Sequence, residues 1–274
     1  MTANKINRLG WETVPDKEFE DYVKVVRKFN KDYSLFENFR RDPDYGKILS
    51  GDVEIIGHHA IANIRELEGL NTFKSNQEEI RRNDSVGNPK IYYYPDFGEI
   101  NPSTLMYFYN TLVVKNIVGS FVPKRVVEIG AGYGGLCRLL YSMHGFEEYN
   151  IIDLPDVVEL AHNYLKNFPE LNEKINYISC NDLKRILDIK KPDLVIANSS
   201  LAELNYDTQS FYTANIFKFT KYAYVIWNTN HIAGKINEMN KFINSFDTNN
   251  FIVENKITHS SINNIYIKPK DDNN

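Results

Sequence analysis

Apolar residues recur at helical spacing through the N-terminal third of the chain. In residues 21–39, DYVKVVRKFNKDYSLFENF, and in residues 55–70, IIGHHAIANIRELEGL, they return every three or four positions, which is typical of a helix with one buried face. Residues 75–90 are polar and contain Asn-Asp-Ser and Val-Gly-Asn-Pro, so they predict a loop. A further helix is predicted to begin at Pro102 or Ser103.

After residue 124, short apolar runs alternate with helix-like segments. Such alternation predicts a mostly parallel sheet that is covered by helices on both faces. A closing hairpin-like pair adds an antiparallel strand, and the result is an α/β fold with a seven-stranded sheet. The predicted strands are residues 125–130, 149–153, 175–180, 193–198, 222–228, 251–258 and 263–269.

The bulk composition is typical of a soluble globular protein, with 42% hydrophobic and 25% charged residues among 274. The net charge of −4 disfavours a nucleic-acid partner, because phosphate binding depends on clustered Lys and Arg. Aromatic residues make up 13% of the chain. Their rings suit sugar and nucleobase surfaces, and they also fill hydrophobic cores.

Compartment and membrane association are predicted from the cysteines and from the lengths of the apolar runs. Cys137 and Cys180 lie in apolar surroundings without the spacing of metal ligands, so we expect reduced, buried thiols in a reducing cytoplasm. Residues 1–22 lack the apolar core of a signal peptide, and no later run approaches the ~20 apolar residues of a membrane helix. We therefore expect a cytoplasmic protein without a membrane span.

The stretch VVEIGAGYGGLCRLL, residues 126–140, joins a strand to a helix through a glycine-rich turn. A helix N-terminus offers unpaired N–H groups, and glycines let a ligand approach the backbone closely because they lack Cβ. Residues 130–135, GAGYGG, also satisfy the dinucleotide fingerprint G-x-G-x-x-G. The glycines alone therefore leave a nicotinamide or flavin cofactor and S-adenosylmethionine as alternatives.

Three acidic residues lie at or just after the ends of consecutive predicted strands. Glu128 comes two residues before Gly130, where a carboxylate would repel a diphosphate and would attract a ligand with ammonium and sulfonium groups. Asp153 could bind both hydroxyls of a ribose, and Asp182 lies within reach of an adenine edge. Each could also be an ordinary polar residue at a strand end, but the three together favour a pocket for a nucleoside with a cationic arm.

The segments EIGAGYGG, IIDLPDV and LVIANSSLAEL resemble the motifs of class I S-adenosylmethionine-dependent methyltransferases. More narrowly, together with NPSTLMY at residues 101–107, they resemble bacterial sugar O-methyltransferases. The likeness covers about residues 34–268, and LFENFRRDPDYGKIL resembles the N-terminal part of that family. Two residues depart from the family pattern, since Met106 stands in place of Arg and Ala202 in place of Ser, and either could alter the acceptor pocket.

The resemblance implies a class I methyltransferase Rossmann-like domain over residues 101–269, a mainly helical, acceptor-binding cap over residues 1–100, and a polar tail over 270–274. It also implies an enzyme that transfers a methyl group from S-adenosyl-L-methionine to a sugar hydroxyl of a nucleotide sugar or surface-glycan unit. Tyr133 could pack on the methionine arm or fill the gap between the sheet and the cap. The predicted cofactor-binding residues are Ser103, Thr104, Glu128, Gly130, Gly132, Tyr133, Asp153, Leu154, Asp182 and Asn198.

An alcohol acceptor must lose a proton, so a base is expected near the ends of the fourth and fifth predicted strands. Glu203 follows the fourth strand and is the first candidate, as the base or as an acceptor of hydrogen bonds from substrate hydroxyls; a solvated acid at a helix start is the alternative. His231 follows the fifth strand and is the second candidate, because imidazole titrates near neutrality. Acids and histidines do not cluster with the spacing of metal ligands, so no metal is predicted.

Two other functions are alternatives at this point. A nicotinamide-dependent oxidoreductase would have an apolar residue at position 128 and a second half that spans a dinucleotide. A non-catalytic module could keep the fold as a binding or scaffold subunit, although Glu128, Gly130, Gly132 and Asp153 indicate retained cofactor binding. The expected partner is a small sugar or nucleotide-sugar acceptor, and the aromatic N-terminal region could serve as a cap or as a homodimer surface.

Overall fold

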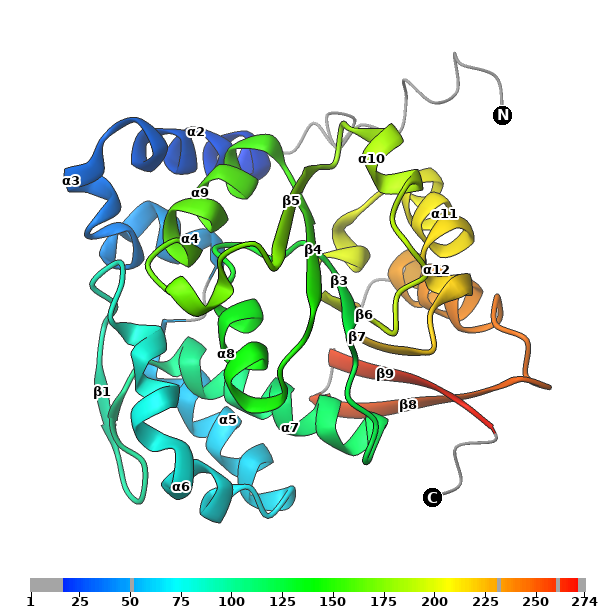
Figure 1. Ribbon diagram of the computed structural model, residues 1–274, viewed down its shortest axis with the longest axis horizontal. Helices are drawn as coiled ribbons and strands as arrows, with labels where there is room; N and C mark the ends of the chain where they lie inside the picture. Colours follow the sequence, from blue (N-terminus) through cyan, green and yellow to red (C-terminus); the bar gives the residue numbers. More distant parts are fainter. Residues whose placement is uncertain (1–16, 50–51, 231–232, 260–261, 271–274) are drawn as a thin grey trace.

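The computed structural model describes residues 17–49, 52–230, 233–259 and 262–270, and its centre is a seven-stranded sheet with helices on both sides (Figure 1). The strands of this sheet are β3 (Arg125–Ile129), β4 (Glu148–Asp153), β5 (Ile175–Ser179), β6 (Leu194–Asn198), β7 (Tyr222–Asn228), β8 (Phe251–His259) and β9 (Ile262–Pro269). Their order is β5-β4-β3-β6-β7-β9-β8, with all pairs from β5 to β7 parallel and β9 antiparallel to both of its neighbours. This confirms the predicted class I methyltransferase Rossmann-like fold.

The connections between the strands reverse direction at β3. From β3 the chain moves outward through β4 to β5, and it then crosses back to β6 on the other side of β3. In open parallel sheets, ligands bind beyond the carboxyl ends of the strands at such a switch point. The glycine-rich turn follows β3 directly and therefore lies at this position.

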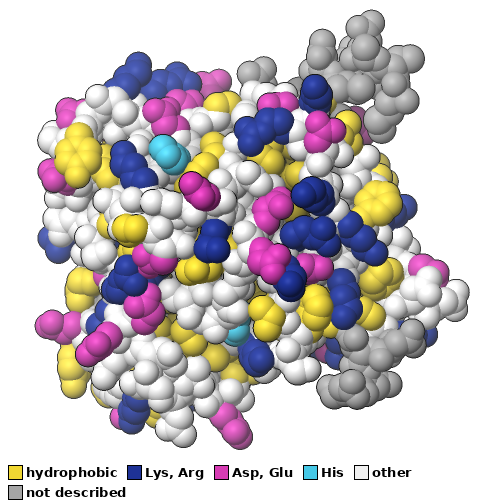
Figure 2. Space-filling model, in the orientation of Figure 1, with side chains coloured by type: hydrophobic (Ala, Val, Ile, Leu, Met, Phe, Trp, Pro, Cys, Tyr) yellow, Lys and Arg dark blue, Asp and Glu magenta, His cyan; other side chains and the backbone are white. Residues whose placement is uncertain are grey.

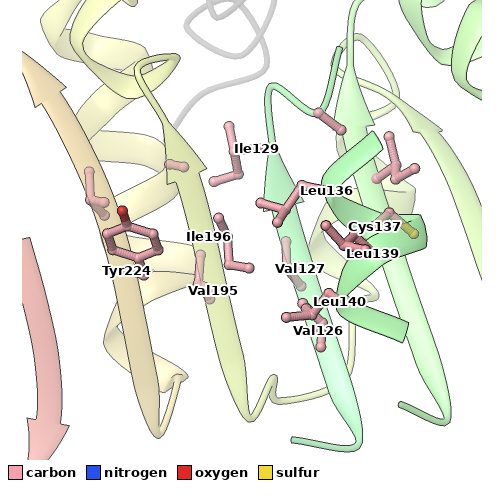
Figure 3. Packing of buried hydrophobic residues seen from close by; sticks show 14 of the residues in the cluster. Val126, Val127, Ile129, Leu136, Cys137, Leu139, Leu140, Val195, Ile196 and Tyr224 are labelled. Atoms are coloured by element: carbon pink, nitrogen blue, oxygen red, sulfur yellow. The ribbon is translucent and has the colours of Figure 1, made fainter. Parts of the chain in front are cut away.

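The helix α8 (Gly135–His144) begins at the glycine-rich turn and packs against the sheet through an apolar face. Leu136, Leu139 and Leu140 are three and four positions apart, so they share one face of the helix. Figure 3 shows this face beside β3, with Leu136, Cys137, Leu139 and Leu140 of α8 labelled; all four are buried, as are Val126, Val127 and Ile129 of the strand. This packing fixes the N-terminus of α8 next to the carboxyl end of β3.

The N-terminal region is mainly helical and lies against the sheet and its helices (Figure 1). Its elements are α2 (Lys17–Lys31), α3 (Tyr33–Phe36), α4 (Pro43–Leu49), α5 (Glu54–Glu66), α6 (Leu70–Arg81), the hairpin of β1 (Tyr92–Tyr94) and β2 (Gly98–Ile100), and α7 (Pro102–Val118). The remaining helices are α9 (Pro155–Leu165), α10 (Leu183–Leu187), α11 (Tyr206–Asn215) and α12 (Ala233–Ile243). None of these described helices has the length and apolar character needed to cross a membrane.

The N-terminal helices share their core with the sheet. Buried apolar residues of both regions belong to one continuous cluster. On the surface, the guanidinium group of Arg27 on α2 donates two hydrogen bonds of 3.0 and 2.9 Å to the carboxylate of Asp156 on α9. The division of the chain at residue 100 into a cap and a sheet domain stays a prediction.

The structure corrects two predicted elements. The helix expected over residues 21–39 is divided at Asp32 into α2, which ends at Lys31, and the short α3. Residues 75–90 were expected to form a loop, but α6 continues to Arg81 and a short 3-10 turn follows at Arg82–Asp84. The helix buries only Phe73 and Ile80, which are two turns apart, and its other positions are largely polar. A buried face this narrow produces little helical periodicity in the sequence.

Candidate functional site

The register of the sheet brings three polar side chains to one face at its carboxyl edge. Glu128 of β3 is paired with Ile151 of β4 and with Ile196 of β6. Side chains alternate between faces along a strand, so Asp153 and Asn198, each two residues further on, lie on the same face as Glu128. Residues that the sequence places at three separate strand ends are thus neighbours in space.

Glu128 lies next to the glycine-rich turn and is only 2% exposed. Its Oε2 atom accepts a hydrogen bond of 2.7 Å from the hydroxyl group of Tyr149. Burial raises the pKa of Glu128 to about 8; the Tyr149 hydrogen bond opposes this shift, and the charge of Asp153 adds to it. The carboxyl group is therefore largely neutral near pH 7, and a cation bound beside it would favour its ionised form.

Asp153 ties the glycine-rich turn to the end of β4. Its Oδ2 atom accepts a hydrogen bond of 3.0 Å from the backbone N–H of Gly132, and Oδ1 accepts one of 2.7 Å from the N–H of Leu154. The side chain is 4% exposed, and burial raises its pKa to about 7, although backbone hydrogen bonds lower it. Each carboxylate oxygen has a second lone pair, so Asp153 could hold the turn and accept ribose hydroxyls at once.

Gly130 and Gly132 both have left-handed backbone conformations, with φ angles of 76° and 55°. A Cβ atom at Gly130 would overlap the side chain of Ser200, whose hydroxyl donates a hydrogen bond to the carbonyl of Ile129. At Gly132, no described atom lies within 4 Å of the position that a Cβ would take. The turn is therefore closed at Gly130 and open at Gly132, where a ligand can approach the backbone.

Tyr133 packs inside an aromatic group. Its ring centroid lies 4.8 Å from that of Tyr164 and 5.6 Å from that of Phe39. Tyr107 contributes a further ring at 5.9 Å, and the guanidinium carbon of Arg40 lies 4.9 Å from the Tyr133 centroid, in a cation–π arrangement. Tyr133 thus fills the gap between the sheet and the N-terminal helices, and its contact with the methionine arm stays a prediction.

Ser103 and Thr104 lie in the first turn of α7 and contact different carboxylates. The Ser103 hydroxyl donates a hydrogen bond of 2.7 Å to Asp52, just before α5. The Thr104 hydroxyl donates one of 2.6 Å to Asp84 and is fully buried. Thr104 thus belongs to an internal polar network, whereas Ser103 joins α7 to the segment ahead of α5.

Two further predicted residues lie at the carboxyl ends of β5 and β6. Asp182, after β5, caps α10 by accepting a hydrogen bond of 3.1 Å from the N–H of Arg185. Asn198 ends β6, and both polar atoms of its amide are buried without a hydrogen-bond partner in the described part of the chain. Such orphaned groups are rare, and the next residue, Ser199, has a strained positive φ of 62°. Together these features make Asn198 a candidate for contact with a ligand.

Glu203 is the last residue of a short 3-10 turn, Leu201–Glu203, that follows β6. Its side chain is accessible to solvent, yet desolvation by the surrounding protein raises its pKa, and the positive charge of Lys235 on α12 opposes the shift. The charge of Glu203 also acts on Asp153 and Tyr22, so these groups lie near one another at the carboxyl edge. His231, the second predicted base, lies outside the described residues.

The N-terminal region adds residues to this site that the sequence did not indicate. Tyr22 of α2 is buried, and its pKa is raised first by burial and then by the charges of Asp153 and Glu203. Asp52 and Arg40 likewise act on the tyrosines that surround the glycine-rich turn. Only the family resemblance marked the segment that contains Arg40, and no local pattern relates Tyr22 or Asp52 to β3.

No family model and no curated protein matches the sequence. Among solved structures, the methyltransferase domain of bacterial CtHen1 is 17% identical, with a TM-score of 0.45 over 58% of this chain and 96% of that domain. An O-methyltransferase family protein from Burkholderia thailandensis is 12% identical, with a TM-score of 0.45 over 60% of this chain and 57% of that one. Mitomycin 7-O-methyltransferase is 14% identical, with a TM-score of 0.41 over 77% and 72%. Similarities this distant carry no conclusion about the reaction.

The residues around the turn fit S-adenosylmethionine by their chemistry. Glu128 can face a cationic group, and Asp153 retains lone pairs for ribose hydroxyls. The backbone is open at Gly132, and the amide of Asn198 has unsatisfied donors and an acceptor. Within the described ranges, no group of three or more His, Cys, Asp or Glu side chains is arranged to hold a metal ion.

Proposed function

We propose that this protein is an S-adenosylmethionine-dependent O-methyltransferase that acts on a sugar hydroxyl. The proposal depends on one observation: two buried carboxyl groups, Glu128 and Asp153, share a face of the sheet beside a turn that is open at Gly132. Burial makes ionisation of both groups costly, and a ligand with a cationic arm and ribose hydroxyls would offset that cost.

A nicotinamide dinucleotide is less compatible with this arrangement. Its diphosphate would have to lie at the glycine-rich turn, close to Glu128 and Asp153. Like charges in a buried site raise each other's pKa values and oppose binding, whereas a sulfonium and an ammonium group reverse the sign of the interaction. The carboxyl groups, more than the glycines, therefore favour the methyl donor.

Bound S-adenosylmethionine would supply a methyl group activated by its attachment to a positively charged sulfur. The residues of this chain then have two tasks. They hold the acceptor oxygen in line with the methyl carbon, which can account for a large part of the rate, and they remove the hydroxyl proton. Glu203 suits the second task, because its raised pKa makes it a better proton acceptor and Lys235 favours its ionised form.

A sugar acceptor is supported by the groups at the carboxyl edge and by the motif resemblance. Tyr22 offers an aromatic ring with a hydroxyl, and Asn198 offers amide donors and an acceptor, which suits a ligand rich in hydroxyl groups. The face in Figure 2 carries Lys and Arg interspersed with Asp and Glu, and the net charge is −4, so a polyanionic acceptor such as RNA is disfavoured. The proposed acceptor is a nucleotide sugar or a surface-glycan unit.

Calorimetric titration separates the proposal from its alternatives. We expect S-adenosylhomocysteine, the spent cofactor, to bind with a dissociation constant on the order of micromolar, and NADH not to bind. Binding of NADH alone would indicate an oxidoreductase. Binding of neither ligand would indicate a module that has lost the cofactor.

Replacement of Glu203 by glutamine is expected to lower turnover about 100-fold or more, because a positioned base contributes that much to proton transfer. The affinity for S-adenosylhomocysteine should change by less than about twofold, since the carboxylate acts on the acceptor. Turnover is measured as S-adenosylhomocysteine released with a panel of nucleotide sugars and monosaccharides. Asp207→Asn is the matched control, because this exposed acid lies four positions further on. Full activity of Glu203→Gln would exclude Glu203 as the base.

A further inference from the structure

The segment before α5 places a carboxylate close to the glycine-rich turn. Asp52 is partly buried, and it accepts a hydrogen bond of 2.7 Å from the hydroxyl of Ser103 in the first turn of α7. This bond joins residues 51 positions apart and sets the direction of the Asp52 side chain. The orientation of the Asp52 side chain thus depends on a residue of α7, which is distant in the sequence.

Helix α7 carries both the residue that binds Asp52 and a ring that lies beside the glycine-rich turn. Ser103 and Tyr107 are four residues apart and therefore share a face of the helix. Tyr107 lies against the start of α8, where a Cβ at Gly135 would meet its ring, and its centroid is 5.9 Å from that of Tyr133. A single helical turn therefore separates the residue that holds Asp52 from the ring that covers the glycine-rich turn.

Two carboxyl groups act on the Tyr107 hydroxyl, Glu128 from the sheet and Asp52 from the N-terminal region. Burial raises the pKa of Tyr107 to about 12; Arg40 opposes this, and the charges of Glu128 and Asp52 each add to it. Asp52 also acts on the hydroxyls of Tyr45 and Tyr133. Asp52 and Glu128 therefore act on one hydroxyl group in common, that of Tyr107.

An ammonium group has three N–H donors and needs several acceptors when it leaves water. Glu128 alone leaves this set incomplete, because Tyr149 already uses one of its oxygens and its ionisation in a buried position carries a desolvation cost. A second carboxylate near Tyr107 would complete the acceptor set and would add a charge-assisted hydrogen bond to the ammonium group.

We propose that Asp52, oriented by Ser103, is the second carboxylate of a receptor for the α-ammonium group of the cofactor's amino-acid arm. This inference rests on the proposed function, because it assigns one end of the same ligand. It adds to the sequence-based expectation, in which Glu128 attracts the cationic groups of the ligand and Ser103 is itself a cofactor-binding residue.

The test compares S-adenosylhomocysteine with its desamino analogue, which keeps the adenosine, the thioether and the carboxylate but lacks the ammonium group. We expect Asp52→Asn to weaken the binding of S-adenosylhomocysteine about tenfold or more, the usual effect of losing a charge-assisted hydrogen bond. The affinity for the desamino analogue, measured by competition, should stay the same. Ser103→Ala should reproduce the effect more weakly.

Glu54→Gln is the control, because this exposed acid lies two residues from Asp52 and its carboxylate lies 4.0 Å from the side chain of His58, on the same helix. It should leave both affinities unchanged. An Asp52→Asn variant that binds both ligands as the wild type does, or that loses both equally, overturns the assignment of Asp52. Failure of the wild type to bind S-adenosylhomocysteine at all would instead overturn the proposed function, and the assignment with it.

Discussion

Alanine at Gly130 is expected to weaken both the fold and cofactor binding, whereas alanine at Gly132 is expected to abolish binding in a protein that stays folded. Both glycines have positive φ angles, so each substitution costs about 1–2 kcal/mol through the backbone alone. At Gly130 the new methyl group also overlaps Ser200, and overpacking of this kind adds about 1–3 kcal/mol. Because folded domains are stable by only about 5–15 kcal/mol, the loss at Gly130 would be readily measured.

At Gly132 the same methyl group meets no described atom within 4 Å. It would project into the space through which a ligand reaches the backbone, so we expect the affinity for S-adenosylhomocysteine to fall at least about 100-fold. The hydrogen bond from the Gly132 N–H to Asp153 needs no side chain and should persist. The variant would therefore separate loss of binding from loss of structure.

Urea unfolding and calorimetry measure the two effects. Adding Ser200→Gly to Gly130→Ala should recover part of the lost stability, because it removes the overlapping side chain; Ser200→Gly alone corrects for the lost hydrogen bond to Ile129. Equal stability of the two alanine variants would show that Ser200 does not restrict position 130. Normal binding by Gly132→Ala would show that the ligand does not lie on this turn.

The sheet could be predicted because its strands are nearly continuous apolar runs. In β3, all residues except the first are buried, and the runs in β4 and β6 are similar. The glycines of the turn were also evident, because no other residue type tolerates positive φ and close approach so well. A strand that is buried on both faces needs apolar residues, and a turn with positive φ angles needs glycines. Each of these needs is met within one short segment and is therefore visible in the sequence.

The rest of the site depends on contacts between distant segments. Asp52 becomes part of it through a hydrogen bond to Ser103, and Tyr22 through the packing of α2 over the carboxyl edge. Neither contact imposes a periodicity on its own segment. At Asp182 the strand-end position predicts a ligand contact, which stays a prediction, and in the structure its carboxylate caps α10, a local task that the same residue type also performs.

Near neutral pH, where Glu128 is proposed to contribute to cofactor binding, we expect this residue to lower the free energy of unfolding. Its pKa is raised from 4.5 to about 8, so between these values the folded state holds a proton that the unfolded state has released. The stabilising effect of the neutral carboxyl group is complete below the lower value and is lost as the pH rises through the higher one. Within that window the free energy of unfolding should fall by about 1.4 kcal/mol per pH unit.

Glutamine at position 128 cannot titrate, and it keeps the shape and the hydrogen-bonding capacity of the neutral acid. We therefore expect the stability of Glu128→Gln relative to the wild type to increase by roughly 3 kcal/mol between about pH 5 and about pH 7.5. Its affinity for S-adenosylhomocysteine should fall about tenfold or more, because the amide gives the ammonium group no negative charge. Urea unfolding across this pH range and calorimetry measure the two effects.

Glu147→Gln provides the comparison, because that carboxylate is exposed and pairs with Lys124 at the surface. It should change neither the pH dependence of unfolding nor the affinity. Parallel pH profiles for the wild type and Glu128→Gln would mean that the buried acid is ionised in the fold. A more stable variant with unchanged affinity would mean that Glu128 meets no ammonium group. The hypothesis that this residue selects a cationic methyl donor would then be wrong. Stability gained together with affinity lost is the combination expected of a residue kept for binding at the expense of the fold.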